Sequence, residues 1–142
     1  MIRKATVEDI NKIGEIGLLI KEDFNNKYDI KNFINYNYAV IYVYEENSNI
    51  VGFIQLEEHF EILDLINIAV AKEYQGKNIG TKLIEYAISN TKAEKIMLEV
   101  RESNISAIKL YEKTNFKEIN RRKKYYGDED AIIMERNLIW KM

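Results

Sequence analysis

One stretch of the chain, residues 62–115, constrains the fold most because strand and helix patterns alternate along it. A long, mostly apolar run, Ile62–Val70, leads through a short glycine-containing loop into a helical pattern that begins near Ile79. A second strand pattern, Lys95–Arg101, and a second helical pattern, Ser106–Asn115, follow. Two strands joined through a helix run parallel, since the crossover returns the chain to the same end of the sheet. The stretch therefore predicts an α/β fold with at least one parallel crossover.

The flanking segments predict further strands and helices. Thr6 and Asp9 have the spacing of a short capping box, and apolar residues then recur at helical spacing through about Lys21. The other predicted elements are a strand at 1–5, a weaker helix at 30–36, a hairpin of strands 39–44 and 50–56, and a closing pair of strands at 116–126 and 131–137. The order β-α-α-β-β-β-α-β-α-β-β predicts a mixed sheet with helices on its faces.

Composition limits the class of protein. The chain has 142 residues, of which 46% are hydrophobic, enough for one domain, residues 1–142, with its own core. Its net charge of −2 argues against a general nucleic-acid binder. No apolar run approaches the roughly 20 residues of a membrane span, and the first ten residues contain no signal-peptide core. We therefore expect a cytoplasmic protein with no membrane partner.

The residue types present also limit the chemistry. There is no cysteine, which excludes disulfides, thiolate nucleophiles and cysteine-bound zinc. His59 is the only histidine, so a multi-histidine metal site is excluded too and no metal is expected. Catalysis has to rest on carboxylates, Tyr, Lys, Ser or Thr side chains and main-chain amides.

The loop after Ile62–Val70 has the composition of an anion-binding turn. It reads Tyr-Gln-Gly-Lys-Asn-Ile-Gly-Thr over residues 74–81 and leads directly into the helix. Amide N–H groups at a helix N-terminus point outward and carry partial positive charge. Gly76 and Gly80 let a ligand approach the backbone closely, and Asn78 tolerates left-handed geometry better than most residues. An ordinary strand-to-helix turn is the other interpretation.

Glu99 and Tyr111 are candidate acid–base residues. Glu99 lies between Leu98 and Val100 on an apolar strand, where burying an unpaired carboxylate is costly. A buried carboxylate is suited to general-base work, whereas a salt bridge with Arg101 or a partly exposed strand end is the other interpretation. Tyr111 follows on the next helix, where an aromatic residue is more often part of the core.

Together these segments resemble the GNAT N-acetyltransferases, which use acetyl-CoA. The resemblance rests on the loop, on Leu-Glu-Val-Arg-x-x-Asn at residues 98–104 and on Ala-Ile-x-Leu-Tyr-Glu-Lys-x-x-Phe at residues 107–116. It spans nearly the whole chain. From Ile68 to Met134 the chain is also similar to the RimI-type subfamily, through Arg-Arg-Lys-Lys-Tyr-Tyr at 121–126 and Glu-Asp-Ala-Ile-Ile-Met at 129–134. RimI-type enzymes acetylate the N-terminal residue, alanine in the type example, of a small-subunit ribosomal protein.

The resemblance implies a fold and a co-substrate. The fold is α/β (α+β), with a mixed, mostly antiparallel sheet of about seven strands and helices on both faces. The co-substrate is acetyl-CoA, with its pantetheine arm along the main chain of residues 68–70 and its pyrophosphate at residues 76–81. The family motif Gln/Arg-x-x-Gly-x-Gly falls on residues 75–80, with Asn78 in place of the first glycine. The implied acetyl-CoA-binding residues are Ile68, Ala69, Val70, Gln75, Gly76, Lys77, Asn78, Ile79, Gly80, Thr81 and Asn104.

The resemblance also implies the catalytic roles. Glu99 matches the proposed general base, and Tyr111 matches the tyrosine proposed to protonate the departing CoA thiolate. Transfer is expected to be direct, because the chain has no cysteine to form an acyl-enzyme.

The sequence defines the acceptor amine less closely than it defines the co-substrate. RimI-type enzymes usually carry an aromatic-Pro-Trp element after the first helix, whereas residues 21–28 here contain Phe24 and neither Pro nor Trp. The candidate substrate-binding residues are Phe24, Tyr125 and Tyr126. The leading acceptor is a protein N-terminus, in a groove open at both ends. A GNAT enzyme acting on a polyamine, amino acid or aminoglycoside, with an acidic pocket of Glu57, Glu58 or Glu61, and a non-catalytic acyl-CoA-binding module are the alternatives.

Three features have no settled role. The basic residues Arg121–Lys124 reach a CoA phosphate or an acidic peptide in one interpretation and form a solvated strand face in the other. His59 is assigned no function. Trp140 packs on the body of the protein or contacts a second copy, and we expect a monomer or a weak homodimer.

Overall fold

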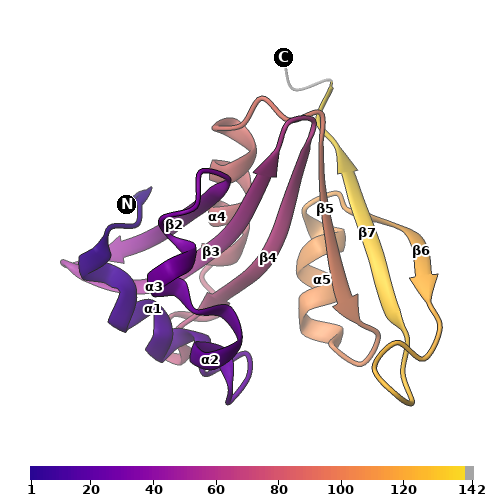
Figure 1. Cartoon of the computed structure of the whole chain (residues 1–142), viewed down its shortest axis with the longest axis horizontal. Coiled ribbons are helices and arrows are strands. Elements are labelled where there is room, and N and C mark those ends of the chain that lie inside the picture. The colour runs from indigo at the N-terminus through magenta and orange to yellow at the C-terminus, as the bar shows by residue number, and fades with distance from the viewer. Residues whose placement is uncertain (140–142) are drawn as a thin grey trace.

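The structure, a computed structural model, describes residues 1–139, so Trp140 lies outside the described residues. Seven strands form one sheet in the order β1-β2-β3-β4-β5-β7-β6, with helices packed against it (Figure 1). The strands are β1 (Ile2–Lys4), β2 (Ala39–Glu46), β3 (Asn49–His59), β4 (Ile62–Val70), β5 (Lys95–Arg101), β6 (Lys117–Arg122) and β7 (Ala131–Asn137). The helices are α1 (Ile10–Gly17), α2 (Phe24–Tyr28), α3 (Ile30–Phe33), α4 (Ile79–Ser89) and α5 (Ile105–Lys113), with 3-10 turns η1 (Val7–Asp9) and η2 (Lys72–Tyr74).

The sheet is mixed, as predicted. The pair β4–β5 is parallel, and every other pair of neighbours is antiparallel. The predicted crossover is confirmed, because α4 connects the two parallel strands. No helix within residues 1–139 is long and apolar enough to cross a membrane.

Both faces of the central strands are buried, because helices cover each side. Ile41 and Val43 of β2 pack with α1, α2 and α3, whereas Tyr42 between them packs with α4. On β3 the buried residues run from Ile50 to Leu56 without alternation. A strand covered on both faces is apolar throughout, which is why period-two alternation is absent here.

The first helix is shorter than its apolar pattern predicts. α1 ends at Gly17, and Leu19 and Ile20 follow in a turn, where they are 49% and 41% exposed. A Cβ atom on Gly17 would lie 2.3 Å from the wholly buried ring of Phe24. The chain turns after Gly17 so that α2 can pack closely on α1, and this turn removes Ile20 from the helix face predicted for it.

Two further differences concern the segment before β2. The sequence pattern predicts one weak helix at 30–36, whereas the structure has the unpredicted α2 and then a short α3. Asp29 separates them with a left-handed φ of 40°. This turn lets two short helices, each with a buried aromatic residue, cover the sheet where one longer helix was expected.

The strands β4 and β5 pair over a short length only. Ile62–Asp64 is in register with Lys95–Met97, and beyond these residues the two strands diverge (Figure 1). β4 remains paired with β3 on its other edge as far as Val70. Within the described chain, the β5 side of residues 65–70 therefore has no strand neighbour. Main-chain N–H and C=O groups in such a segment need another partner.

A register shift in β4 decides which way its side chains face. Gln55 lies opposite Asn67, and Leu56 lies opposite Leu65, so Ile66 is an extra residue on β4. Strict alternation would turn Asn67 toward α4, with Leu65, but one extra residue reverses the face of the residues after it. Asn67 instead shares a face with Gln55, and its Nδ2 donates to Gln55 Oε1 at 2.8 Å.

The variant Gly17→Ala tests the close packing of α1 on α2. Overpacking usually costs about 1–3 kcal/mol, which outweighs the roughly 1 kcal/mol by which alanine favours a helix over glycine. Gly14→Ala is the matched control, since a Cβ there meets only the end of the exposed Asn25 side chain, which can rotate away. We expect the urea midpoint to fall for Gly17→Ala and to hold or rise for Gly14→Ala. Equal midpoints for the two variants would contradict this packing.

Candidate active site

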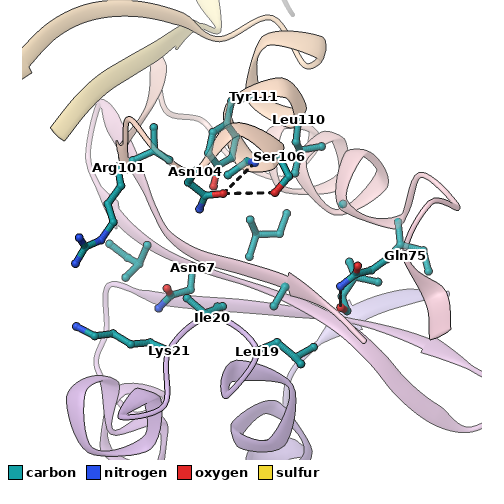
Figure 2. A pocket seen from close by; sticks show the side chains of 18 of the residues that line it. Leu19, Ile20, Lys21, Asn67, Gln75, Arg101, Asn104, Ser106, Leu110 and Tyr111 are labelled. Atoms are coloured by element: carbon teal, nitrogen blue, oxygen red, sulfur yellow. Dashed lines mark hydrogen bonds between the residues drawn. The ribbon is translucent and has the colours of Figure 1, made fainter. Parts of the chain in front are cut away.

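A cavity of about 640 Å³ lies where β4 and β5 diverge (Figure 2). Its lining comes from the α1–α2 turn, α2, β4, the loop before α4, the first turn of α4, β5, α5 and the β6–β7 loop. Every predicted acetyl-CoA-binding residue except Lys77 lines it, together with Glu99, Tyr111 and Tyr126. Lys77 instead places its Nζ 5.1 Å from the centre of the Tyr74 ring. The fold thus brings the two segments that carry the predicted acetyl-CoA-binding and catalytic residues, 68–81 and 99–111, to one cavity.

The loop before α4 has the geometry of an anion-binding turn. Gly76 has a φ of 81°, and a Cβ there would meet no atom within 4 Å, so its backbone faces open space. Asn78 adopts the left-handed conformation, with a φ of 63°, at the N-terminus of α4. Gln75 Nε2 donates to the carbonyl oxygen of Val70 at 3.0 Å, which fixes the loop to the end of β4.

The residue in place of the motif glycine has a partner of its own. Lys113 Nζ, from the last turn of α5, donates to Asn78 Oδ1 at 2.7 Å, and both residues line the cavity. The bond therefore places a cation beside the turn. Gly80 serves packing more than ligand approach, because a Cβ on it would lie 3.2 Å from Leu110 of α5.

One polar atom at the start of α4 has no partner in the protein. Within the described residues, the hydroxyl oxygen Oγ1 of Thr81 is buried and has no hydrogen-bond partner. An unpaired buried hydroxyl destabilises a protein unless a ligand or water satisfies it. Thr81 lines the cavity beside the outward-facing turn at Gly76. These features fit a phosphate-bearing ligand at this end of the cavity.

Glu99 is a partly exposed strand residue. Its side chain is 32% exposed, and its Oε1 lies 3.2 Å from Arg122 Nε. The alternate residues Ile96, Leu98 and Val100 are buried in the core beneath α5, whereas Glu99 points to the other face of β5. The structure does not bury Glu99, and it bears out the partly exposed strand residue, whereas the predicted salt bridge with Arg101 is wrong, because Glu99 pairs with Arg122 and Arg101 pairs with Glu129.

Tyr111 belongs both to the core and to the cavity. It is 7% exposed and packs against Phe116, with ring centres 5.7 Å apart, while its side chain reaches from α5 toward the cavity (Figure 2). Burial raises the pKa of the Tyr111 phenol to about 12. The hydroxyl therefore keeps its proton over the whole neutral range, as a proton donor must.

Asn104 caps helix α5. Its Oδ1 accepts hydrogen bonds from Ala107 N at 3.3 Å and from Ser106 Oγ at 3.4 Å (Figure 2). An asparagine at this position satisfies a main-chain donor that the helix cannot. The cap orients the first turn of α5 along the cavity wall, in the same helix that carries Leu110 and Tyr111.

Of the three residues predicted to bind the acceptor, Phe24, Tyr125 and Tyr126, only Tyr126 lines the cavity. Phe24 is wholly buried between Tyr28 and Phe53 and does not line the cavity, so the structure does not bring it to the predicted acceptor groove. Its size and its contact with Gly17 make it a core residue. Tyr28, one turn later, lines the cavity in its place. Tyr125 is 54% exposed and lies outside the cavity lining, packed against the lining residue Tyr126.

The structure adds lining residues that the sequence patterns did not single out. Lys21, Lys27, Asn67 and Arg101 all line the cavity, with Lys27 over the ring of Tyr28 and Arg101 over the ring of Tyr126. Figure 2 shows Asn67 between Arg101 and the turn that carries Ile20 and Lys21. The one available signal was Asn67 itself, a polar residue within an apolar strand.

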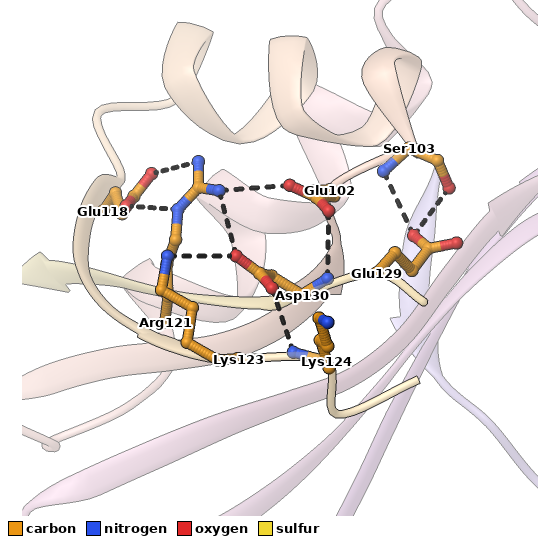
Figure 3. A network of polar contacts seen from close by, with 8 residues as sticks. All are labelled: Glu102, Ser103, Glu118, Arg121, Lys123, Lys124, Glu129 and Asp130. Carbon is orange, nitrogen blue, oxygen red and sulfur yellow. Dashed lines mark hydrogen bonds and ion pairs between the residues drawn. The ribbon is translucent and has the colours of Figure 1, made fainter. Parts of the chain in front are cut away.

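The basic segment Arg121–Lys124 anchors the β6–β7 loop. Arg121 binds Glu118 at 2.8 Å, Glu102 at 3.1 Å and Asp130 at 3.5 Å (Figure 3). Asp130 also accepts the main-chain N–H of Lys124 at 2.9 Å. None of residues 121–124 lines the cavity. The charges of Arg121 and Lys123 and the main-chain N–H of Lys124 hold the loop that carries Tyr126 against the β5–α5 turn, and the segment contributes nothing to the cavity lining.

The acidic residues of the β3–β4 hairpin lie elsewhere. Glu57, Glu58 and Glu61 do not line the cavity, and Glu57 instead pairs with His59 at 2.9 Å. Within residues 1–139 there is no group of three or more His, Asp or Glu residues that could hold a metal ion.

Comparison with known proteins agrees with this geometry. The acetyltransferase (GNAT) family model matches residues 10–116. An N-alpha-acetyltransferase of Saccharolobus solfataricus is 36% identical over an alignment of 155 residues, which covers 96% of this chain and 92% of that protein. A ribosomal protein bS18-alanine N-acetyltransferase of Haemophilus influenzae is 40% identical over 97 residues, or 63% of this chain and 66% of that protein.

A solved structure extends the agreement to the fold. The ribosomal-protein-S18-alanine N-acetyltransferase from Escherichia coli has a TM-score of 0.86 and 27% identity to this chain, covering 97% of this chain and 93% of that one. The expected resemblance to GNAT enzymes, RimI-type enzymes among them, is confirmed. With a family model over most of its length and relatives that span nearly all of it, the chain belongs to the acetyltransferase (GNAT) family and is an N-acetyltransferase.

Proposed function

We propose that this N-acetyltransferase transfers the acetyl group of acetyl-CoA to the N-terminal α-amine of a protein, as RimI-type enzymes do. The observation that carries the proposal is one cavity with two chemically different ends. An anion-binding turn that begins at Gln75 lies at one end, Lys21 and Arg101 lie at the other with the Glu99 carboxylate two residues before Arg101 on β5, and Tyr111 reaches the cavity from α5. The names of the relatives, an N-alpha-acetyltransferase and a ribosomal protein-alanine N-acetyltransferase, support the choice of acceptor.

The residues for acetyl-CoA are those of the turn and of the unpaired edge of β4. The amides of residues 76–81, the Thr81 hydroxyl and the Lys113 ammonium hold the pyrophosphate. The main-chain groups of residues 68–70 that β3 leaves unpaired, apart from the Val70 carbonyl that accepts from Gln75, hydrogen-bond the pantetheine arm, and an N–H near Val70 stabilises the oxyanion. When bound, acetyl-CoA supplies an activated acetyl thioester. A neighbour in fold, a putative streptothricin acetyltransferase from Bacillus anthracis, was crystallised with acetyl coenzyme A.

Glu99 and Tyr111 divide the proton transfers between them. An N-terminal ammonium has a pKa near 8, so at neutral pH it must lose a proton before its nitrogen can attack. Glu99 takes this proton, directly or through one water, and the free amine attacks the thioester carbonyl. As the carbon–sulfur bond breaks, Tyr111, which keeps its proton because of burial, donates that proton to the departing sulfur, and the second proton of the nitrogen returns to the phenolate.

The charges near Glu99 favour a protein N-terminus over a polyamine. Lys21, Lys27 and Arg101 line this end, and Glu99 is the only carboxylate among the described lining residues. A polycation would meet Lys27, the Arg101–Glu129 and Lys21–Asp23 pairs, and a single lining carboxylate that already pairs with Arg122. The acidic pocket that a polyamine enzyme needs is absent here, since Glu57, Glu58 and Glu61 lie outside the lining.

The acceptor is tested by thiol release from acetyl-CoA over a panel of amines. The panel holds peptides that begin with Ala, Ser, Thr or Met, together with spermidine, free amino acids and an aminoglycoside, and product masses identify the acetylated nitrogen. We expect acetylation of peptide α-amines. Turnover of small amines alone would overturn the acceptor, and acetyl-CoA binding without turnover of any amine would favour a non-catalytic module.

The variant Glu99→Gln tests the general base. We expect kcat/KM for the peptide to fall about 10²–10⁴-fold, the usual contribution of a general base, with acetyl-CoA affinity unchanged. Glu112→Gln, an exposed residue of α5 outside the cavity, is the matched control and should keep wild-type kinetics. Wild-type kcat/KM in Glu99→Gln would rule out this role.

The variant Tyr111→Phe tests the proton donor. We expect kcat to fall about tenfold, a modest share of acid–base catalysis because a thiolate is already a fair leaving group. Since burial raises the pKa of Tyr111 to about 12, its proton stays in place below that pH. Between about pH 8 and pH 10, therefore, ionisation of Tyr111 should not lower the kcat of wild type, and kcat should depend on pH in the same way in wild type and in Tyr111→Phe. A Tyr111-dependent decline in that range would contradict the assignment.

The variant Thr81→Val tests the site for the pyrophosphate. Removing an unpaired buried hydroxyl should raise the unfolding free energy of the free protein by about 1 kcal/mol and weaken acetyl-CoA binding about tenfold, which are opposite effects. Thr114→Val is the control, because its hydroxyl already donates to Leu110 O at 2.9 Å. It should lose stability and bind acetyl-CoA as wild type does. Calorimetry of binding and urea denaturation measure both, and unchanged affinity in Thr81→Val would exclude the contact.

A further inference from the structure

We infer that Asn67 binds the amine of the acceptor opposite Glu99, and that Gln55 positions Asn67 for this task. The inference rests on the proposed function, since it concerns the acceptor end of the same cavity. It adds a substrate-binding residue and a positioning residue to that site. Four observations carry it: the burial of Asn67, its hydrogen bond, its place in the sheet and the polarity of its neighbours.

The first observation is that Asn67 is a buried polar residue with access to the cavity. The buried polar residues of the described chain are Asp9, Gln55, Asn67, Thr91 and Thr114. Asn67 is the one among them that lines the large cavity, although only 6% of its surface is exposed. An amide buried in an apolar sheet costs free energy unless its hydrogen bonds are made. Leucine or valine would fill this position without that penalty.

The second observation is that Gln55 fixes the orientation of the Asn67 amide. Gln55 is 1% exposed, and its Oε1 accepts a hydrogen bond from Asn67 Nδ2 at 2.8 Å. This bond uses a donor of Asn67 and leaves its carbonyl oxygen as an acceptor. Within the described residues, no hydrogen bond to Asn67 Oδ1 is formed. The buried pair therefore presents a held carbonyl oxygen at the cavity wall.

The third observation is that Asn67 and Glu99 lie on the two edges of the opening between β4 and β5. Asp64 is level with Met97 in the last parallel pair, so Glu99 is level with the extra residue Ile66, which directly precedes Asn67. Because of that extra residue, Asn67 turns to the same face as Glu99. Without the register shift, Asn67 would point away from it.

The fourth observation is that the cationic lining residues at the acceptor end can only donate hydrogen bonds. Lys21, Lys27 and Arg101 carry N–H groups and cannot accept a hydrogen bond from an amine. A neutral carbonyl oxygen accepts a hydrogen bond from the ammonium before Glu99 removes a proton and from the amine afterwards. The nitrogen keeps one N–H on Asn67 while its lone pair is free for attack, so Asn67 holds the amine through the proton transfer.

The variants Asn67→Leu and Asn67→Leu/Gln55→Leu separate this role from a structural one. Asn67→Leu leaves Gln55 with an unpaired buried amide, whereas the double variant removes both polar groups and should restore stability. We expect KM for an acceptor peptide to rise about 10- to 100-fold in both variants, the usual range for a hydrogen bond to a charged group, with acetyl-CoA affinity within about twofold of wild type. Wild-type KM in the double variant would overturn the inference.

A binding measurement provides a readout that does not depend on turnover. Two peptides are titrated into the protein saturated with CoA, one with its N-terminal amine and one with a hydroxyl in its place. Wild type should bind the amine at least about tenfold more tightly than the hydroxyl, and the double variant, which keeps Glu99, should lose about tenfold of that preference. Full discrimination by the double variant would assign the amine to another residue.

These outcomes also distinguish the inference from the proposed function. If wild type acetylates peptides and the double variant retains wild-type KM and discrimination, the proposed function stands and only the role of Asn67 fails. If wild type acetylates no peptide and does not discriminate between the two titrated peptides, the proposed acceptor fails, and the inference fails with it.

Discussion

The site depends on how soon β4 and β5 stop pairing. The two strands are held together near Asp64 and Met97, at one end of the parallel crossover, and diverge after that. A sheet with this geometry keeps a continuous core on the α4 side and still leaves the edge of β4 unpaired toward the opening. Main-chain groups that would elsewhere complete a sheet are free to bind a ligand. The anion-binding turn, the carboxylate and the tyrosine all surround this opening.

Different kinds of local contact hold each wall of the opening in place. The extra residue Ile66 turns Asn67 toward the acceptor end, and the Gln55–Asn67 hydrogen bond holds it there. The close contact of Gly17 with Phe24 ends α1 early and places the turn with Ile20 and Lys21 against the cavity. The ion pairs of Arg121 fix the loop that bears Tyr126. Each wall thus comes from a different part of the chain, and the cavity is a product of the tertiary fold.

The structure brings together the residues that the sequence assigns to acetyl-CoA far more completely than those it assigns to the acceptor. The turn at 75–81, Glu99 and Tyr111 belong to a strand–helix–strand–helix run whose patterns are strong, and β4, β5 and β7 end where their patterns end. The acceptor half depends on packing that no local pattern records. Phe24 was predicted to line the groove because it is an aromatic residue after the first helix. Gly17 has no side chain, so the Phe24 ring packs directly against it and is buried in the core. Asn67 could not be assigned a face, since the register shift at Ile66 appears only when β3 is beside β4.

The central claim is that the diverging edge of β4 receives acetyl-CoA, and amide hydrogen exchange of the protein with and without CoA tests it most directly. The account predicts that CoA slows exchange at the main-chain amides of residues 65–70 and of the turn at 75–81, while amides of the β2–β3 hairpin are unchanged. Protection confined to other segments, with residues 65–70 exchanging as they do in the free protein, would contradict it.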